Sequence, residues 1–184
     1  MIRAQYNSFL HYKNILKTII LGSSHARHGF IPNFYSAYSF NLGVGSCDLI
    51  HCYYLLKKIT NTQSRYYTPQ LSEVILYFSY FHFYYNLYKS KRNFVPILLS
   101  TFFEIPKSYT VVNEREVKKS FHLIPPYSDY IDTAMKHHGF ISFSALYSEQ
   151  KYDTQRYSII TLQSTQFEWL EKIAHLCKKL NLKF

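Results

Sequence analysis

The sequence predicts a single α/β domain spanning residues 1–184, a three-layer sandwich of helices around a mostly parallel sheet. Short apolar runs rich in β-branched and aromatic residues, which are typical of buried strands, end at glycines or polar residues. Stretches with apolar residues at helical spacing also occur along the chain. The composition, 47% hydrophobic and 17% charged over 184 residues, is that of one globular domain and not of a disordered chain.

Three segments have the character of strands. Residues 17–21 (KTIIL) are a β-branched apolar run that ends at Gly22 and two serines. Residues 37–42 (AYSFNL) repeat the pattern more weakly, and Gly43 and Gly45 follow them. Residues 73–81 (EVILYFSYF) are nearly all apolar, so we expect a central strand that is covered on both faces.

Two helices are predicted from their end signals. Residues 47–59 have helical spacing, with Ser46 as the expected N-cap and Asp48 in the first turn. In the C-terminal region Thr165 and Glu168 form an expected capping box, and Asn181 is the expected C-cap. The apolar stripe of that last helix is Phe167, Leu170, Ile173, Ala174, Cys177 and Leu180.

The region between the third strand and the last helix is expected to be a largely helical insertion. Asn113 and Glu116 resemble a capping pair, and two prolines follow at residues 125–126. Residues 128–138 then form a short expected helix with Gly139 at its C′ position. Because a helix such as the last one usually leads into another parallel strand, the chain is expected to lack its final strand.

Charge and cysteine content limit the classes of partner. The formal net charge is +10, but the basic pairs are scattered and no nucleic-acid reader motif accompanies them, so nucleic-acid binding is not expected. The three cysteines form no CxxC pair, which argues against a disulfide framework or a zinc knuckle and for a reducing, cytoplasmic location. No apolar run is long enough for a signal peptide or a membrane span. No cofactor is predicted.

The turn after the first strand carries the most informative residues. A serine there lies at the carboxyl edge of a parallel sheet, where open α/β folds place their sites. The run LGSSHARHG (residues 21–29) resembles the first block of the SGNH (GDSL-like) hydrolase superfamily, whose GDS appears here as Gly22-Ser23-Ser24. The run NLGVGS (residues 41–46) resembles its second block.

This resemblance implies a flavodoxin-like plan and an acyl-transfer site. It matches Ser24 to the nucleophile, and the backbone N–H groups of Ser24 and Gly43 to two donors of the oxyanion hole. The implied substrate is a small acyl ester, such as an acetyl group on a surface glycan. The implied reaction is hydrolysis of the ester or transfer of its acyl group to another hydroxyl.

The chain departs from the family pattern at two blocks. The third strand is followed by no early asparagine, and His82 is the residue that could substitute as a donor. The final Asp-x-x-His block is absent from the C-terminal region, so no catalytic base is identified, although His25 and His82 are candidates. Asp48 and His51 have that spacing but follow the second block, and we interpret them as a helix N-terminus and a partly buried imidazole.

Other interpretations remain open. The chain could be a non-catalytic, truncated SGNH-like module that only binds a ligand or partner, with Ser24 acting as a helix N-cap. An exposed sheet edge would then favour self-association. His25 and His28 have metal-ligand spacing on a helix, but no carboxylate or cysteine completes a set, so no metal is predicted. A nucleic-acid binder would instead show affinity that falls steeply with salt.

Overall fold

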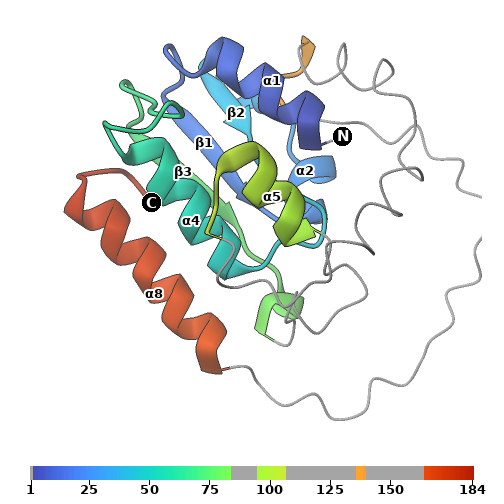
Figure 1. Cartoon of the computed structure of the whole chain (residues 1–184), viewed down its shortest axis with the longest axis vertical. Helices are drawn as coiled ribbons and strands as arrows, with labels where there is room; N and C mark the ends of the chain where they lie inside the picture. The colour runs from blue at the N-terminus through green and yellow to red at the C-terminus, as the bar shows by residue number, and fades with distance from the viewer. Residues whose placement is uncertain (1, 84–94, 107–135, 140–163) are drawn as a thin grey trace, which may run out of the picture.

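The computed structural model describes residues 2–83, 95–106, 136–139 and 164–184 (Figure 1). Its sheet contains three parallel strands in the order β2-β1-β3. The strands are β1 (Thr18–Gly22), β2 (Ser39–Asn41) and β3 (Glu73–Tyr77). The mixed α/β class and the parallel sheet are therefore confirmed.

The helices account for most of the remaining described residues. Four lie in the first half of the chain: α1 (Ile2–Tyr12), α2 (Ser24–Gly29), α3 (Pro32–Tyr35) and α4 (Leu49–Thr60). A 3₁₀ helix, η1 (Tyr80–Phe83), follows β3, and α5 (Val95–Phe103) and α8 (Ser164–Lys179) complete the set. None of these described helices combines the length and the apolar character needed to cross a bilayer.

The strand that is covered on both faces is not the one that the sequence predicts. All five residues of β1 are buried, and this strand pairs with both neighbours, so β1 is the strand covered on both faces. The expected central strand, residues 73–81, was wrong in extent: β3 ends at Tyr77, and its side chains are mostly half-buried. The reason is local, because the His82 N–H donates to the Ser79 carbonyl and turns the aromatic run into η1.

The C-terminal residues return to the sheet beside β3. Lys183 forms an isolated parallel bridge with Glu73. The Lys183 N–H donates to the Ser72 carbonyl, and the Val74 N–H donates to the Lys183 carbonyl, at 2.9 and 2.8 Å. The turn before the bridge is made by Asn181 at φ 54°, which supports its expected role at the end of α8.

Two predicted helix starts were wrong by a few residues. Asp48, and not Ser46, is the N-cap of α4, because its side chain accepts from the His51 N–H while Ser46 adopts a left-handed turn at φ 63°. The last helix begins at Ser164, so Thr165 lies inside its first turn and is not the cap. The expected stripe of α8 holds at Ile173 and Cys177, whereas Phe167 and Leu180 are exposed.

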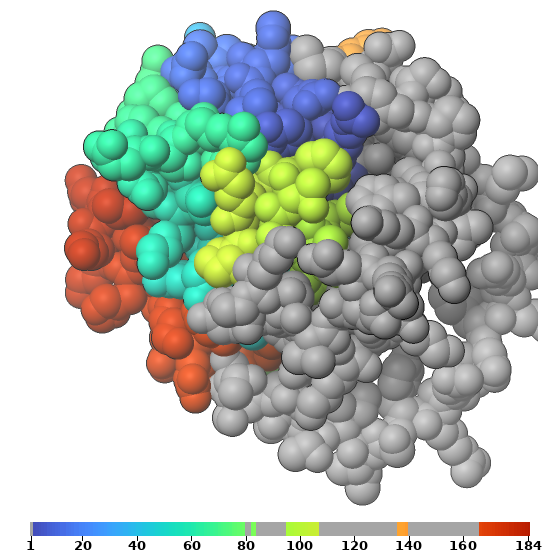
Figure 2. All heavy atoms as spheres, in the orientation of Figure 1, coloured from blue at the N-terminus to red at the C-terminus, as the bar shows by residue number. Residues whose placement is uncertain are grey.

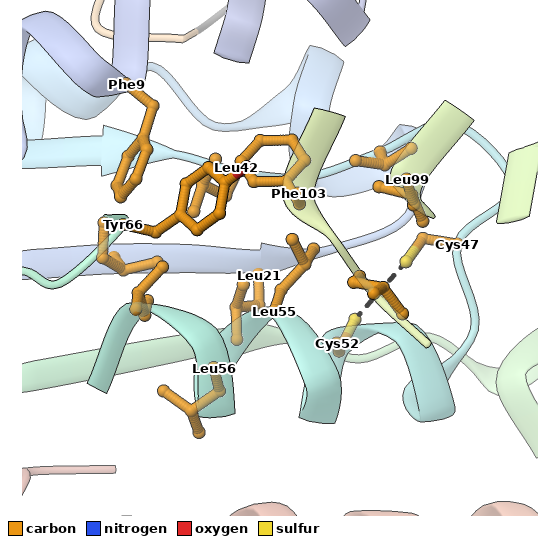
Figure 3. Packing of buried hydrophobic residues seen from close by; sticks show 14 of the residues in the cluster. Phe9, Leu21, Leu42, Cys47, Cys52, Leu55, Leu56, Tyr66, Leu99 and Phe103 are labelled. Atoms are coloured by element: carbon orange, nitrogen blue, oxygen red, sulfur yellow. Dashed lines mark hydrogen bonds between the residues drawn. The ribbon is translucent and has the colours of Figure 1, made fainter. Parts of the chain in front are cut away.

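The core lies between β1 and the helices α1, α4 and α5. Phe9 of α1, Leu21 of β1, Leu55 of α4 and Phe103 of α5 are fully buried and meet there (Figure 3). On the face shown in Figure 2, α5 lies between α1 and α4. The helix α1 was not predicted from the sequence. Its residues are mostly polar or tyrosine, and its buried face contains few large apolar side chains, of which Phe9 is one.

Part of the expected insertion lies outside the described residues. This holds for the capping pair Asn113 and Glu116, for the two prolines and for most of the helix at 128–138. Within the described part, α5 is helical as the insertion predicts, and Gly139 has the positive φ (83°) expected after a helix. The His138 carbonyl accepts from the Asn41 N–H, so this segment lies beside β2.

Candidate active site at the carboxyl edge of the sheet

Ser24 lies where the sequence predicts it, directly after β1. It is the first residue of α2 and is half-buried. The N-cap of α2 is its neighbour Ser23, which is fully buried and whose Oγ accepts from the His25 N–H at 3.3 Å. The capping role that was open for Ser24 therefore belongs to Ser23. Ser24 lies at the carboxyl edge of the sheet, and its side chain does not cap α2.

Gly22 lets β1 turn tightly into α2. Its φ is +142°, a conformation that residues with a side chain rarely adopt. A Cβ at this position would lie 2.7 Å from the Tyr77 carbonyl oxygen and 2.9 Å from the Ala26 Cβ. The end of β3 and the first turns of α2 thus pack directly on the backbone that presents Ser24.

Asn41 ties the loop after β2 to α2. It is fully buried, and its Nδ2 donates to the carbonyls of Ala26 and Phe30 at 2.7 and 2.8 Å. Its Oδ1 accepts from the Gly43 N–H at 2.8 Å. One side chain therefore satisfies a carbonyl of α2 and the carbonyl of its C-cap residue, and holds the second glycine turn against the helix.

Gly43 approaches α2 closely. A Cβ there would lie 2.8 Å from the Arg27 backbone nitrogen and 2.9 Å from the Ala26 Cβ. The two sequence blocks therefore meet in space, as expected for neighbouring loops at one sheet edge. The Gly43 N–H, however, donates to Asn41, so Asn41 would have to release it before Gly43 could serve an oxyanion. That role of Gly43 stays a prediction.

Two buried polar side chains that the sequence analysis missed support the same loop. Gln5 of α1 donates from Nε2 to the Asn41 and Gly43 carbonyls at 2.8 and 2.9 Å. Arg27 of α2 is only 5% exposed, and a Cβ at Gly45 would lie 3.3 Å from its Nη1. Gln5 lies outside both sequence blocks, and Arg27 lies within the first block but was given no role there. The roles of both residues depend on α1 and α2 packing around the loop.

His82 lies at the same edge, after β3. It is fully buried, stacks on Phe78 and holds its Nδ1 within 3.1–3.3 Å of the backbone and hydroxyl of Ser79. Burial lowers the pKa of His82, against opposing effects of the Ser79 backbone and the Asp48 charge, while His25 lowers it further. His82 is therefore a neutral imidazole at pH 7, and both Asp48 and His25 are near enough to act on it electrostatically.

Asp48 and His51 form a buried pair at the start of α4. Asp48 Oδ1 accepts from the His51 backbone N–H at 3.2 Å and contacts His51 Nδ1 at 2.5 Å. The first of these bonds is the N-cap interaction, which confirms the interpretation of Asp48 as a helix N-terminus. His51 is more deeply buried than expected, with 2% of its surface exposed.

The catalytic base is not placed by a direct contact. In the described part of the chain, no hydrogen bond joins the Ser24 hydroxyl to an imidazole. His25 is exposed, and its Nδ1 lies 3.4 Å from the Oγ of Ser23 instead. Within the described residues there is also no group of three or more metal-ligating side chains, and this holds around His25 and His28 as well.

No protein-family model, no curated protein and no solved structure matches this chain. The resemblance to SGNH hydrolases accordingly depends on the runs at residues 21–29 and 41–46. In the structure the turn from β1 into α2 and the loop after β2 adjoin at the carboxyl edge of a parallel sheet, the edge where open α/β folds place their sites.

Proposed function

We propose that the chain is a serine-nucleophile acyl-ester hydrolase or acyltransferase of the SGNH plan, acting on a small acyl ester such as an acetyl group on a glycan. The observation that carries the proposal is the placement of Ser24. Its half-buried hydroxyl follows β1 at the first turn of α2, and the Gly43 loop packs against that same helix. A nucleophile beside backbone amides is the arrangement that acyl transfer needs.

The proposed reaction has two steps. The Ser24 Oγ attacks the acyl carbon while its proton passes to a base, and the carbonyl oxygen becomes an oxyanion facing the Ser24 and Gly43 amides. The alcohol leaves with a proton, and an acyl-serine remains. Water or an acceptor hydroxyl then attacks this ester and regenerates Ser24, which distinguishes hydrolysis from transfer.

We favour His82 as the base. It lies at the carboxyl edge, and its lowered pKa keeps it neutral. In the tautomer whose Nδ1–H donates to the Ser79 carbonyl at 3.1 Å, Nε2 carries the lone pair that would take the proton. Asp48 acts on His82 so as to raise its pKa, which would stabilise the imidazolium that forms. His25, exposed beside Ser24, is the second candidate.

A fluorophosphonate probe tests the nucleophile. We expect the folded wild-type chain to be labelled on the peptide that contains Ser24 and the Ser24→Ala variant to be unlabelled. Ser72→Ala is the matched control, because Ser72 is a serine at the opposite edge of the sheet and should leave labelling unchanged. Labelling that persists in Ser24→Ala would overturn the proposal.

The base is tested by the rate of the same labelling. His82→Gln should slow it by about 10²- to 10⁴-fold if His82 takes the proton, whereas His25→Gln should leave it within a few-fold. The reverse pattern would assign the base to His25. Hydrolysis of an aryl acetate by the same variants then reports the complete cycle.

A non-catalytic, SGNH-like binding module is the second candidate. Two observations favour it: Asn41 already accepts from the Gly43 N–H, and no hydrogen bond joins the Ser24 hydroxyl to an imidazole among the described residues. A folded wild-type chain that the probe does not label would support this alternative.

The finer structural and cellular predictions belong to the same proposal. The parallel bridge between Lys183 and Glu73 supports the proposed three-layer SGNH plan, in which a fourth strand would lie beside β3. Leu180 and Phe184 are 39% and 52% exposed near that edge, which supports self-association. All three cysteines are free thiols, consistent with the proposed cytoplasmic location. Light scattering over a range of concentrations tests the association.

A further inference from the structure

Two cysteines meet at the start of α4. Cys47 and Cys52 are both fully buried, and their sulfur atoms lie 3.8 Å apart. Figure 3 shows the two side chains pointing toward one another from the loop before α4 and from its first turns. The proposed acyl-transfer reaction uses neither of them.

The helix start brings the two sulfurs together. Because Asp48 is the N-cap of α4, Cys47 occupies the position before the cap and Cys52 occupies the fourth helical position. Side chains at these two positions commonly pack together as a hydrophobic staple that fixes how the chain enters a helix. The contact between the sulfurs therefore follows from the capping geometry of Asp48.

A staple made of two thiols can become covalent. The sulfurs of a disulfide lie about 2.05 Å apart, so Cys47 and Cys52 would have to approach by about 1.8 Å. A separation of 3.8 Å also suits two thiolates on one zinc ion, but no third ligand joins them in the described part of the chain. The third cysteine, Cys177 of α8, is buried, contacts neither of these sulfurs in the described part of the chain and serves as an internal comparison.

We propose that Cys47 and Cys52 form an intramolecular disulfide when the protein meets a peroxide. One thiolate attacks a peroxide oxygen, becomes a sulfenic acid and releases hydroxide, which takes up a proton to become water. The second thiol then attacks that sulfur, the S–S bond forms, and a second water leaves. The two sulfurs together lose two electrons, and one peroxide is reduced to two waters.

Burial sets the speed of this reaction. The hydrogen bond with Cys52 and burial raise the pKa of Cys47, so little thiolate is present while α4 is intact. Oxidation therefore requires the first turn of α4 to open, which is a local event near a helix end. Once formed, the bond would join the end of the Gly43–Ser46 loop to α4 and restrict a loop of the candidate site.

The test uses the reduced full chain treated with hydrogen peroxide. We expect the intact mass to fall by two hydrogen atoms, two of the three thiols to disappear, and peptide mapping to find a Cys47–Cys52 bond that dithiothreitol reverses. Cys177→Ala should behave like the wild type, and Cys52→Ala should show no such mass loss. Because Cys52→Ala removes a buried side chain, Cys47→Ala provides an independent second variant.

Three outcomes would overturn the proposal. They are a disulfide that includes Cys177, oxygen adducts on Cys47 or Cys52 without loss of hydrogen, and thiols that stay reduced under conditions that oxidise the urea-unfolded chain. None of these readouts involves Ser24, so the result is independent of the proposed function.

Discussion

The two edges of the sheet use polar groups for different purposes. At the amino edge, the Glu73 carboxylate accepts from Thr18 at 2.9 Å, from Tyr35 at 2.8 and 2.9 Å, and from Lys183 at 2.6 Å. At the carboxyl edge, Asn41 and Gln5 hold backbone groups in place. No hydrogen bond of the Ser24 hydroxyl is found there among the described residues.

The two edges differ in burial: one carboxylate that is 13% exposed holds the amino edge, whereas fully buried amides hold the carboxyl edge. The amino edge joins three parts of the chain through a carboxylate whose hydrogen-bonding capacity is used. The carboxyl edge buries its amides to fix two loops and leaves a hydroxyl in reach of solvent. We therefore expect changes at the carboxyl edge to cost more stability, because its network is buried, and to affect function directly.

The largest effect is expected for Asn41→Ala. The substitution leaves the Ala26 and Phe30 carbonyls and the Gly43 N–H without their buried partner, and we expect a loss of about 3 kcal/mol in the free energy of unfolding. Urea denaturation measures it. Asn33→Ala, at an exposed asparagine, should change stability by less than about 0.5 kcal/mol. Equal losses of unfolding free energy for the two variants would show that the buried hydrogen bonds of Asn41 do not stabilise the fold.

The second-largest effect is expected for Gly43→Ala. We expect a loss of about 2 kcal/mol in the free energy of unfolding, because the new methyl group would clash with the backbone of α2. Gly29→Ala is its matched control. A Cβ at Gly29 meets nothing within 4 Å, so this change should be neutral or slightly stabilising. Thermal and urea unfolding compare the pair, and a harmless Gly43→Ala would mean that the two loops are not packed as described.

The stability of the carboxyl edge should depend on pH through His82. Its pKa is lowered in the folded state, so below about pH 6.5 the unfolded chain binds a proton that the folded chain resists. The contribution of His82 is therefore complete above that pH and is lost as the pH falls to the lowered folded value. The difference in unfolding free energy between wild type and His82→Gln, measured from pH 7.5 to 5, should shrink on acidification. A difference that grows would contradict the assignment.

The smallest effect is expected at the amino edge. Lys183, followed by Tyr35 and Thr18, lowers the pKa of Glu73 against the effect of burial, so its stabilisation is present above the ordinary pKa of glutamate and is lost as the pH falls through the lowered one. Glu73→Gln should cost no more than about 1 kcal/mol at pH 7. Its unfolding curve should converge on the wild type at acidic pH, and labelling of Ser24 should be unchanged.

The parts of this molecule that follow from local sequence were predictable. The β1 run and its glycine turn, the end of α8 at Asn181 and the position of Ser24 all depend on patterns within a few residues. The parallel pairing joins distant strands and was predicted from the βα order of the elements. The cap of α4 was misassigned because Ser46 and Asp48 both favour that position, and only the left-handed turn at Ser46 decides between them.

Features that depend on contacts between distant segments could not be predicted. Gln5 reaches Asn41 across 36 residues of sequence, and the burial of His82 depends on where η1 turns. The contact between Cys47 and Cys52 follows from the positions of these residues relative to the N-cap of α4. It could have been predicted from the sequence only if Asp48 had been identified as that cap.

The bridge between Lys183 and Glu73 also fixes the direction in which the backbone runs at the C-terminal residues. Because the bridge is parallel, the backbone at Phe184 heads from the amino edge toward the edge that holds Ser24. Any polypeptide joined there, such as a purification tag or a fused reporter, would leave Phe184 in the direction of the carboxyl edge. A tag at the other terminus, before α1, is therefore the safer choice for measuring activity.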